Sequence, residues 1–115
     1  MDGIRIIEKP ISIADLREIA KLRFGDMVKA VVDVQKKIMA VGGELHADSE
    51  AVMLDHGSKQ ADLWGINIYV DQPRESRVEF DSMINIRPSQ GNRSRSVEDE
   101  SIRQIIIQIV NSLIE

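Results

Sequence analysis

Residues 27–41 read MVKAVVDVQKKIMAV, and the way this stretch folds decides the fold class of the whole chain. In its first half, a set of small apolar residues at 28, 30, 32 and 34 alternates with a mixed set at 29, 31 and 33. This alternation and the many β-branched residues both favour a strand. The segment 33–36 is polar and typical of a tight turn, and two glycines at 42–43 end the pattern. We therefore predict a β-hairpin over 27–42. The alternative is one long helix, because Lys, Gln, Met and Ala are good helix formers.

On the N-terminal side of this hairpin, the sequence predicts one strand and one helix. Residues 4–8 are mostly apolar and stop before a proline, which is typical of a short strand. Ser12 is suited to cap a helix, with Asp15 in its first turn, and Gly25 is a plausible end for the segment.

On the C-terminal side, two more strands and two more helices are predicted. A short helix over 48–55, capped by Asp48, precedes a strand over 63–70 in which Trp64 belongs to the apolar face. Residues 78–87 alternate most regularly and give the clearest strand prediction. A helix over 97–114, opened by Ser96, completes the chain. Its apolar residues recur at helical spacing: Ile102, Ile105, Ile106, Ile109, Val110 and Leu113.

These elements predict an α+β fold built as a single domain over residues 1–115. The simplest arrangement is a mostly antiparallel sheet of about four to five strands with the helices packed on one face. A chain of 115 residues with 43% hydrophobic residues is sufficient for one core without disulfides.

Composition excludes several classes of protein. The chain has no cysteine, so it has neither a disulfide nor a thiolate metal site, and it fits a reducing cytoplasm. Its N-terminus lacks the pattern of a signal peptide, and no apolar run is long enough to span a membrane. A formal net charge of −4 argues against nucleic acid as a partner over the whole surface, although a local basic patch stays open.

The segment 42–48, GGELHAD, carries the first candidate site. In an extended chain Glu44, His46 and Asp48 would share one face, and carboxylates beside an imidazole serve metal binding or acid–base chemistry. The ligand set is sparse, so we favour local roles for these side chains and predict no metal site. Glu44 and His46 stay as candidate catalytic residues.

The segment 85–95, NIRPSQGNRSR, carries the second candidate site. It holds three arginines and no acidic residue, in a protein that is acidic overall. The run ends where the last helix is expected to begin, and free amides at a helix N-terminus favour anions. Arginine is also suited to bidentate binding of phosphate or carboxylate. The predicted ligand-binding residues are Asn85, Arg87, Gln90, Asn92 and Arg93. The alternative is a solvated or structural loop, with Arg87 bound to a carboxylate or to a backbone carbonyl.

Two functions follow from these candidates. The first is a domain that binds a small anionic molecule such as a phosphate, nucleotide or carboxylate, with the question of enzymatic activity left open and no cofactor assigned. The alternative is a non-catalytic module for protein interaction or homodimerisation. A ligand site requires His46 to converge with Arg87 or Arg93 on one pocket.

The chain also resembles a family of short prokaryotic proteins of unknown function. The shared pattern consists of GGELHAD, LWGIN and INIRPSQGNRS, within a match over roughly residues 24–113. The resemblance implies one domain and brings no reaction, ligand or catalytic residue with it.

Overall fold

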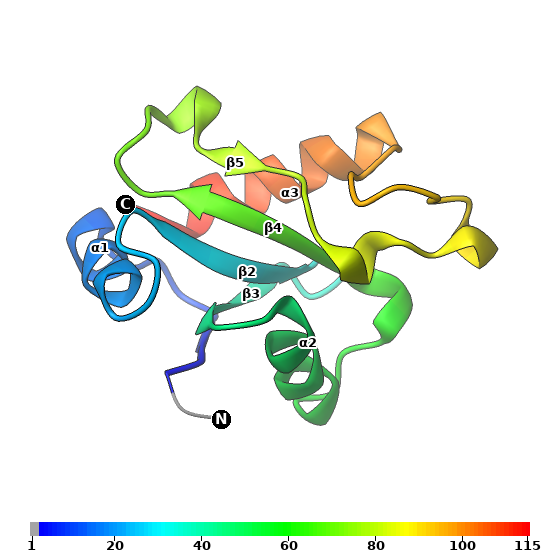
Figure 1. Ribbon diagram of the computed structural model, residues 1–115, viewed down its shortest axis with the longest axis horizontal. Helices are drawn as coiled ribbons and strands as arrows, with labels where there is room; N and C mark the ends of the chain where they lie inside the picture. Colours follow the sequence, from blue (N-terminus) through cyan, green and yellow to red (C-terminus); the bar gives the residue numbers. More distant parts are fainter. Residues whose placement is uncertain (1–2) are drawn as a thin grey trace.

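The computed structural model describes residues 3–115 and contains one antiparallel sheet of five strands. The order across the sheet is β1-β3-β2-β4-β5, so the β2–β3 hairpin lies at its centre (Figure 1). The strands are β1 (Arg5–Ile7), β2 (Met27–Asp33), β3 (Ile38–Gly43), β4 (Leu63–Tyr69) and β5 (Val78–Glu79). The predicted α+β class and the number of strands are confirmed.

The central hairpin is confirmed, and the alternative of one long helix is wrong. Asp33 determines the turn, because its Oδ1 accepts hydrogen bonds from the backbone N–H groups of Gln35 and Lys36 at 2.9 and 2.8 Å. Its second carboxylate oxygen accepts from the Ser58 hydroxyl at 2.6 Å. Lys37 follows the turn with a φ of 60°, which is a left-handed value that an α-helix does not contain. A helix through this segment would lose all of these turn contacts.

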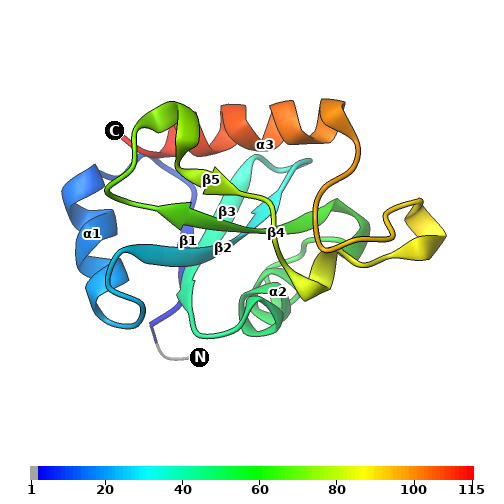
Figure 2. The ribbon, with the colours of Figure 1, turned by 45° about the horizontal axis from the view of Figure 1, so that its top comes forward.

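The three helices cover both faces of the sheet. They are α1 (Ile13–Lys21), α2 (His46–Asp55) and α3 (Glu100–Leu113). Figure 2 shows α3 above the sheet and α2 below it. Helices α1 and α3 share the larger core, whereas α2 covers a smaller one. The expectation that the helices pack on one face therefore holds only for α1 and α3. The reason is that the second face is also apolar at Val31, Ile38 and Ala40, and needs a cover of its own.

Two helix boundaries differ from the predicted ones. Helix α3 is capped by Asp99, whose Oδ1 accepts from the N–H of Ser101 at 2.8 Å, so Ser96 lies outside the helix. Helix α2 begins at His46, and Asp48 lies in its first turn instead of capping it. By contrast, Ser12 caps α1 as predicted, by accepting from the N–H of Asp15 at 3.0 Å. No helix in the described part of the chain is long and apolar enough to cross a membrane.

The predicted strand over 78–87 is wrong beyond its first residues. Only Val78 and Glu79 pair with β4, and the chain then forms the short 3₁₀ helices η3 (Met83–Asn85) and η4 (Pro88–Gln90). The Asn85 side chain replaces the missing strand, because its amide bonds to both the N–H and the carbonyl of Gly65. The apolar residues of this segment alternate as they would in a strand, which is why a strand was predicted. After Glu79, however, the bonds to the Gly65 backbone of β4 come from the Asn85 side chain and not from a paired backbone.

Candidate functional site

A pocket of about 260 Å³ opens where the start of α2 meets the segment after β5. Strands β2 and β4 form its floor. It is lined by Lys29, Leu45, His46, Ala47, Asn67, Asp81, Ser82, Met83, Ile84 and Arg95. The pocket therefore combines residues from five separate parts of the sequence, and only the folded chain brings them together.

His46 is the titratable side chain at the centre of this arrangement. It is 8% exposed, and its Nε2 donates a hydrogen bond to the Ile66 carbonyl at 2.8 Å. Burial is the largest cause that lowers the pKa of His46 below its ordinary value of 6.5, and Lys29 and Arg95 lower it further. The Ile66 bond and Asp81 act in the opposite direction. The imidazole is therefore neutral at pH 7, with its proton on Nε2.

The second imidazole nitrogen is left available by this tautomer. Among residues 3–115, no hydrogen-bond partner is found for Nδ1 of His46. A neutral imidazole with a proton on one nitrogen has an acceptor lone pair on the other. His46 can thus accept a hydrogen bond, or a proton, from a molecule in the pocket.

Lys29 and Asn67 lie directly opposite each other on β2 and β4. Lys29 is half-buried, has no ion pair within the described chain, and places its Nζ 5.2 Å from the centroid of the Phe24 ring. Asn67 donates from Nδ2 to Glu79 at 2.9 Å, while its buried Oδ1 has no partner. The pocket lining thus contains one cation and, directly opposite it, an amide whose buried oxygen the protein leaves unsatisfied.

Arg95 and Asp81 complete the polar part of the lining. Arg95 Nε lies 2.6 Å from Asp81 Oδ1, and both side chains are about half exposed to solvent. With His46 neutral, Lys29, Arg95 and Asp81 leave the lining with one net positive charge. This charge suits a ligand with a single negative charge.

The mouth of the pocket is apolar. Leu45 and Met83 line it and are 54% and 66% exposed. Ile84 and Ala47 also line the pocket. A bound molecule could therefore place a polar group on the floor and an apolar part between Leu45 and Met83.

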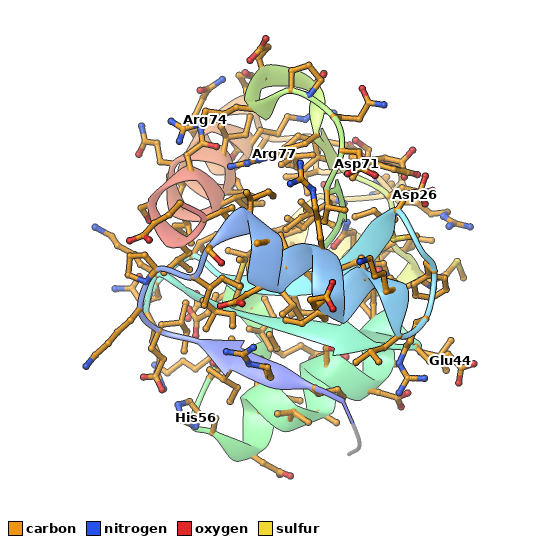
Figure 3. All side chains as sticks on the ribbon, turned by 90° about the vertical axis from the view of Figure 1, so that its left-hand side faces the viewer. Asp26, Glu44, His56, Asp71, Arg74 and Arg77 are labelled. Atoms are coloured by element: carbon orange, nitrogen blue, oxygen red, sulfur yellow. The ribbon has the colours of Figure 1, made fainter. Side chains whose placement is uncertain are left out.

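Glu44 and Asp48 do not form one site with His46, because neither of them lines the pocket that His46 lines. Strand β3 ends at Gly43 and helix α2 begins at His46, so the three side chains do not share a strand face. Glu44 is exposed at the edge of the molecule and does not line the pocket (Figure 3). Within residues 3–115, no three His, Asp or Glu side chains are grouped as they would be around a metal ion.

The two predicted asparagines hold their own loop together. Asn85 is fully buried and bonds to Gly65 and to the Arg95 carbonyl. Asn92 donates from Nδ2 to the carbonyls of Asn85 and Ser96, each at 2.7 Å, and its Oδ1 accepts from the Glu98 N–H. Since these bonds use the amide groups internally, a ligand would have to displace them.

Arg87 and Gln90 also bind backbone carbonyls. Arg87 donates from Nη1 to Gln60 and from Nη2 to Leu63, the latter at 2.7 Å, and its guanidinium carbon lies 4.1 Å from the centroid of the Trp64 ring. Gln90 donates to the Ala61 carbonyl at 3.2 Å. This is the alternative expected from the sequence, in which Arg87 bonds to a backbone carbonyl.

Arg93 is the remaining predicted ligand-binding residue, and it is exposed. Neither Arg93 nor Arg87 lines the pocket that holds His46; the third arginine of the run, Arg95, does. The expected convergence of His46 with Arg87 or Arg93 on one pocket therefore does not occur, and Arg95 is the arginine that lies with His46 instead. Whether the exposed loop itself binds an anion stays a prediction.

Sequence reasoning missed Lys29, Asn67 and Asp81 as members of one site. The sequence pattern could have indicated two of them, because Lys29 and Asn67 are polar residues within largely apolar, buried strands. Asp81 and Arg95 come from segments without regular structure, and no periodicity predicts where those segments lie.

One protein-family model matches nearly the whole chain. The model of the family described as "Protein of unknown function (DUF5674)" matches residues 5–113, and the chain belongs to this family. The match includes β1 and α1, which lie outside the resemblance over roughly 24–113. Neither a curated protein nor a solved structure matches the chain.

Proposed function

We propose that this protein binds a small anionic molecule in the pocket lined by Lys29, His46, Asn67 and Arg95. The observation that carries the proposal is the combination, in one concave site, of an unpaired Lys29 with a neutral His46 whose Nδ1 is free. Perturbed titratable groups in a pocket are typical of functional sites.

The chemistry of the lining narrows the class of ligand. Lys29 and Arg95 favour a carboxylate or a singly charged phosphate ester, since Asp81 opposes additional negative charge. Asn67 Oδ1 is buried without a donor, and His46 Nδ1 can accept from one. A molecule with one singly charged anionic group and a hydroxyl or amino group nearby suits this lining, as a hydroxy acid or an amino acid does.

An enzymatic role is a narrower form of the same proposal. His46 Nδ1 can act as a general base towards a donor held against it, because the imidazole is neutral at pH 7. Ser82 does not offer a nucleophile, since it is buried and its hydroxyl accepts from the Ile84 N–H. A cytoplasmic location belongs to this proposal as well, on the ground that the chain contains no cysteine.

A thermal-shift screen tests the proposal, because a ligand that binds only the folded chain raises its Tm. The panel contains hydroxy acids, amino acids, nucleotides and inorganic phosphate at pH 7.5 and constant ionic strength. We expect a hit whose Kd rises about tenfold or more in Lys29→Ala, the loss of one charge-assisted contact. His46→Gln should weaken the same hit.

Arg93→Ala is the matched control, because it removes an exposed cation of the neighbouring loop. If Arg93→Ala abolishes binding while Lys29→Ala leaves it unchanged, the ligand binds the loop and the pocket proposal fails. If no compound in the panel stabilises the protein, the ligand class is wrong.

The exposed side chains of Leu45 and Met83 favour the second candidate, a homodimerisation module. Under this proposal the apolar mouth of the pocket is covered by a second copy of the chain. Sedimentation analysis at micromolar concentration should then show a dimer that Met83→Glu dissociates. A monomeric wild type would contradict the dimer proposal.

A further inference from the structure

The pocket that His46 lines is small enough to limit the size of its ligand. Its volume is about 260 Å³, and a water molecule in the liquid takes up about 30 Å³. If each non-hydrogen atom takes the room of one water, the pocket accommodates about nine of them. This is the size of a single amino acid or a short hydroxy acid. A nucleotide is much larger and would leave most of its atoms outside the walls.

Apolar side chains from two elements line this pocket. Leu45 and Ala47 come from the start of α2, and Met83 and Ile84 come from η3. Leu45 and Met83 remain largely exposed in the unliganded chain. An apolar part of a ligand that packed against these side chains would remove apolar surface from water on both sides, which is favourable. A wholly polar ligand of the same size would gain nothing from these walls.

The charges of the lining favour one carboxylate on the ligand and no second one. Arg95 is already paired with Asp81, whereas Lys29 has no ion pair among residues 3–115. A single carboxylate therefore balances the charge of Lys29. A second carboxylate in the same small pocket would lie near Asp81, and like charges repel each other.

His46 distinguishes a hydroxyl group from an ammonium group on the ligand. Its Nε2 donates to the Ile66 carbonyl, so its Nδ1 is an acceptor that either group could satisfy. Lys29 and Arg95 are close enough to lower the pKa of His46, because they disfavour a positive charge on the imidazole. A ligand ammonium at Nδ1 would meet the same repulsion. A hydroxyl donates the same hydrogen bond and brings no charge.

We propose that the ligand of this pocket is a short monocarboxylic hydroxy acid with an apolar side chain. Its carboxylate binds Lys29, its hydroxyl donates to His46 Nδ1, and its side chain packs between Leu45 and Met83. The inference rests on the proposed function, because it names the class of anion that the same pocket takes. It excludes nucleotides, amino acids and dicarboxylates, which the proposed function by itself does not.

Acids of nearly equal size separate the features of this ligand. In α-hydroxyisocaproate all of them are present. Isocaproate lacks the hydroxyl, leucine has an ammonium group in its place, and malate has a second carboxylate instead of the apolar chain. Isothermal titration calorimetry measures each Kd under the conditions of the thermal-shift screen. We expect α-hydroxyisocaproate to bind about tenfold or more tightly than each of the other acids, since each comparison removes or opposes one contact.

Met83→Ala and Leu45→Ala test the apolar walls, and both replace exposed side chains that the fold does not need. Each should raise the Kd of α-hydroxyisocaproate about two- to fivefold, the effect of losing one or two buried methylene groups. The Kd of malate should not change. Leu54→Ala is the matched control, because it removes another exposed leucine of α2 that does not line the pocket.

The outcomes separate this inference from the proposed function, provided that Lys29→Ala and inorganic phosphate are included. If isocaproate, leucine, malate or phosphate binds as tightly as α-hydroxyisocaproate and depends on Lys29, the inference is overturned while the proposed function stands. The same holds if Met83→Ala and Leu45→Ala bind α-hydroxyisocaproate as Leu54→Ala does. If no compound binds in a way that depends on Lys29, the proposed function fails and the inference fails with it.

Discussion

The side-chain amide of Asn85 bonds to the backbone of Gly65 as a neighbouring strand would. Its Oδ1 accepts from the Gly65 N–H at 2.8 Å, and its Nδ2 donates to the Gly65 carbonyl at 2.9 Å. The edge of β4 is thus satisfied where β5 has already ended. Gly65 permits the approach, because a Cβ at this position would lie 2.6 Å from the Cβ of Ser82.

Replacing Asn85 by Asp should therefore be strongly destabilising. A carboxylate keeps the shape of the side chain, but it cannot donate to the carbonyls of Gly65 and Arg95. We expect the free energy of unfolding to fall by about 2–3 kcal/mol, the cost of leaving buried groups unsatisfied. Urea denaturation measures the change, and Gln90→Glu, at an exposed position of the same loop, serves as the control. Equal effects of the two variants would contradict this account.

Gly65→Ala should destabilise the protein through the contact with Ser82. The added methyl group would meet both the Cβ and the Oγ of Ser82 at less than 3 Å. We expect a loss of about 1–3 kcal/mol, as for other overpacked sites. Ser82→Gly removes both clashing atoms, so the double variant should lose less stability than the two single changes predict together. Simple additivity in a double-mutant cycle would show that the clash is not the cause.

Arg87→Ala should lower the Tm without affecting ligand binding in the His46 pocket. The variant leaves the carbonyls of Gln60 and Leu63 without their donor and uncovers the Trp64 ring. We expect a loss of about 1–3 kcal/mol. Trp64 fluorescence follows unfolding directly, since it is the only tryptophan in the chain. An unchanged Tm combined with weaker ligand binding would support the anion-binding role for Arg87 instead.

The burial of His46 should make stability depend on pH. Because its pKa in the folded state is below 6.5, the unfolded chain takes up a proton first as the pH falls. The stabilising contribution is therefore present above about pH 6.5, and it decreases as the pH falls through that value towards the lowered one. One such group gives a slope of at most about 1.4 kcal/mol per pH unit.

Comparison of His46→Gln with the wild type between pH 7.5 and 5 isolates this contribution. The variant should show a flatter dependence in that range, whereas the matched variant His56→Gln, at the exposed end of α2, should follow the wild type. If the wild type and His46→Gln have parallel stability curves, His46 is not the group responsible.

Neighbouring isoleucines in α3 test the orientation of that helix. Ile106 is fully buried, whereas Ile105 is 38% exposed. We expect Ile106→Asp to prevent folding or to cost more than about 4 kcal/mol, because it buries an unpaired charge in the core. Ile105→Asp should cost much less. Circular dichroism melts of the two variants measure the difference, and similar melts would mean that the helix is rotated from the orientation described.

The elements that the sequence predicted well are those with strong local signals. The hairpin was predictable because its turn and its β-branched strands agree, and α3 because its apolar stripe extends over several turns. The apolar stripe did not predict the edge of the buried face, because it included Ile105, which is 38% exposed. Similarly, the pattern placed the start of α3 at Ser96, whereas Asp99, which is also a good capping residue, caps the helix.

The site was predictable only in part. His46 and the arginine run were recognised from their chemistry, but the run contributes Arg95 to the pocket, and Asn85, Arg87, Gln90 and Asn92 bond to backbone groups. A polar residue in a loop has the same sequence signature whether it binds a ligand or a backbone carbonyl. The distinction depends on which unpaired carbonyls lie nearby, and for Arg87 and Gln90 these belong to residues 24 to 29 positions away.

The sequence by itself determined the fold class, the central hairpin and the helices α1 and α3, because capping, turn chemistry and apolar periodicity act over a few residues. Only the tertiary structure decided that α2 covers the second face and that the predicted strand over 78–87 ends at Glu79. It also decided that Lys29, His46, Asn67 and Arg95 meet in one pocket. These features depend on contacts between distant segments, whose hydrogen bonds and charges are satisfied or left unsatisfied only when the whole chain has folded.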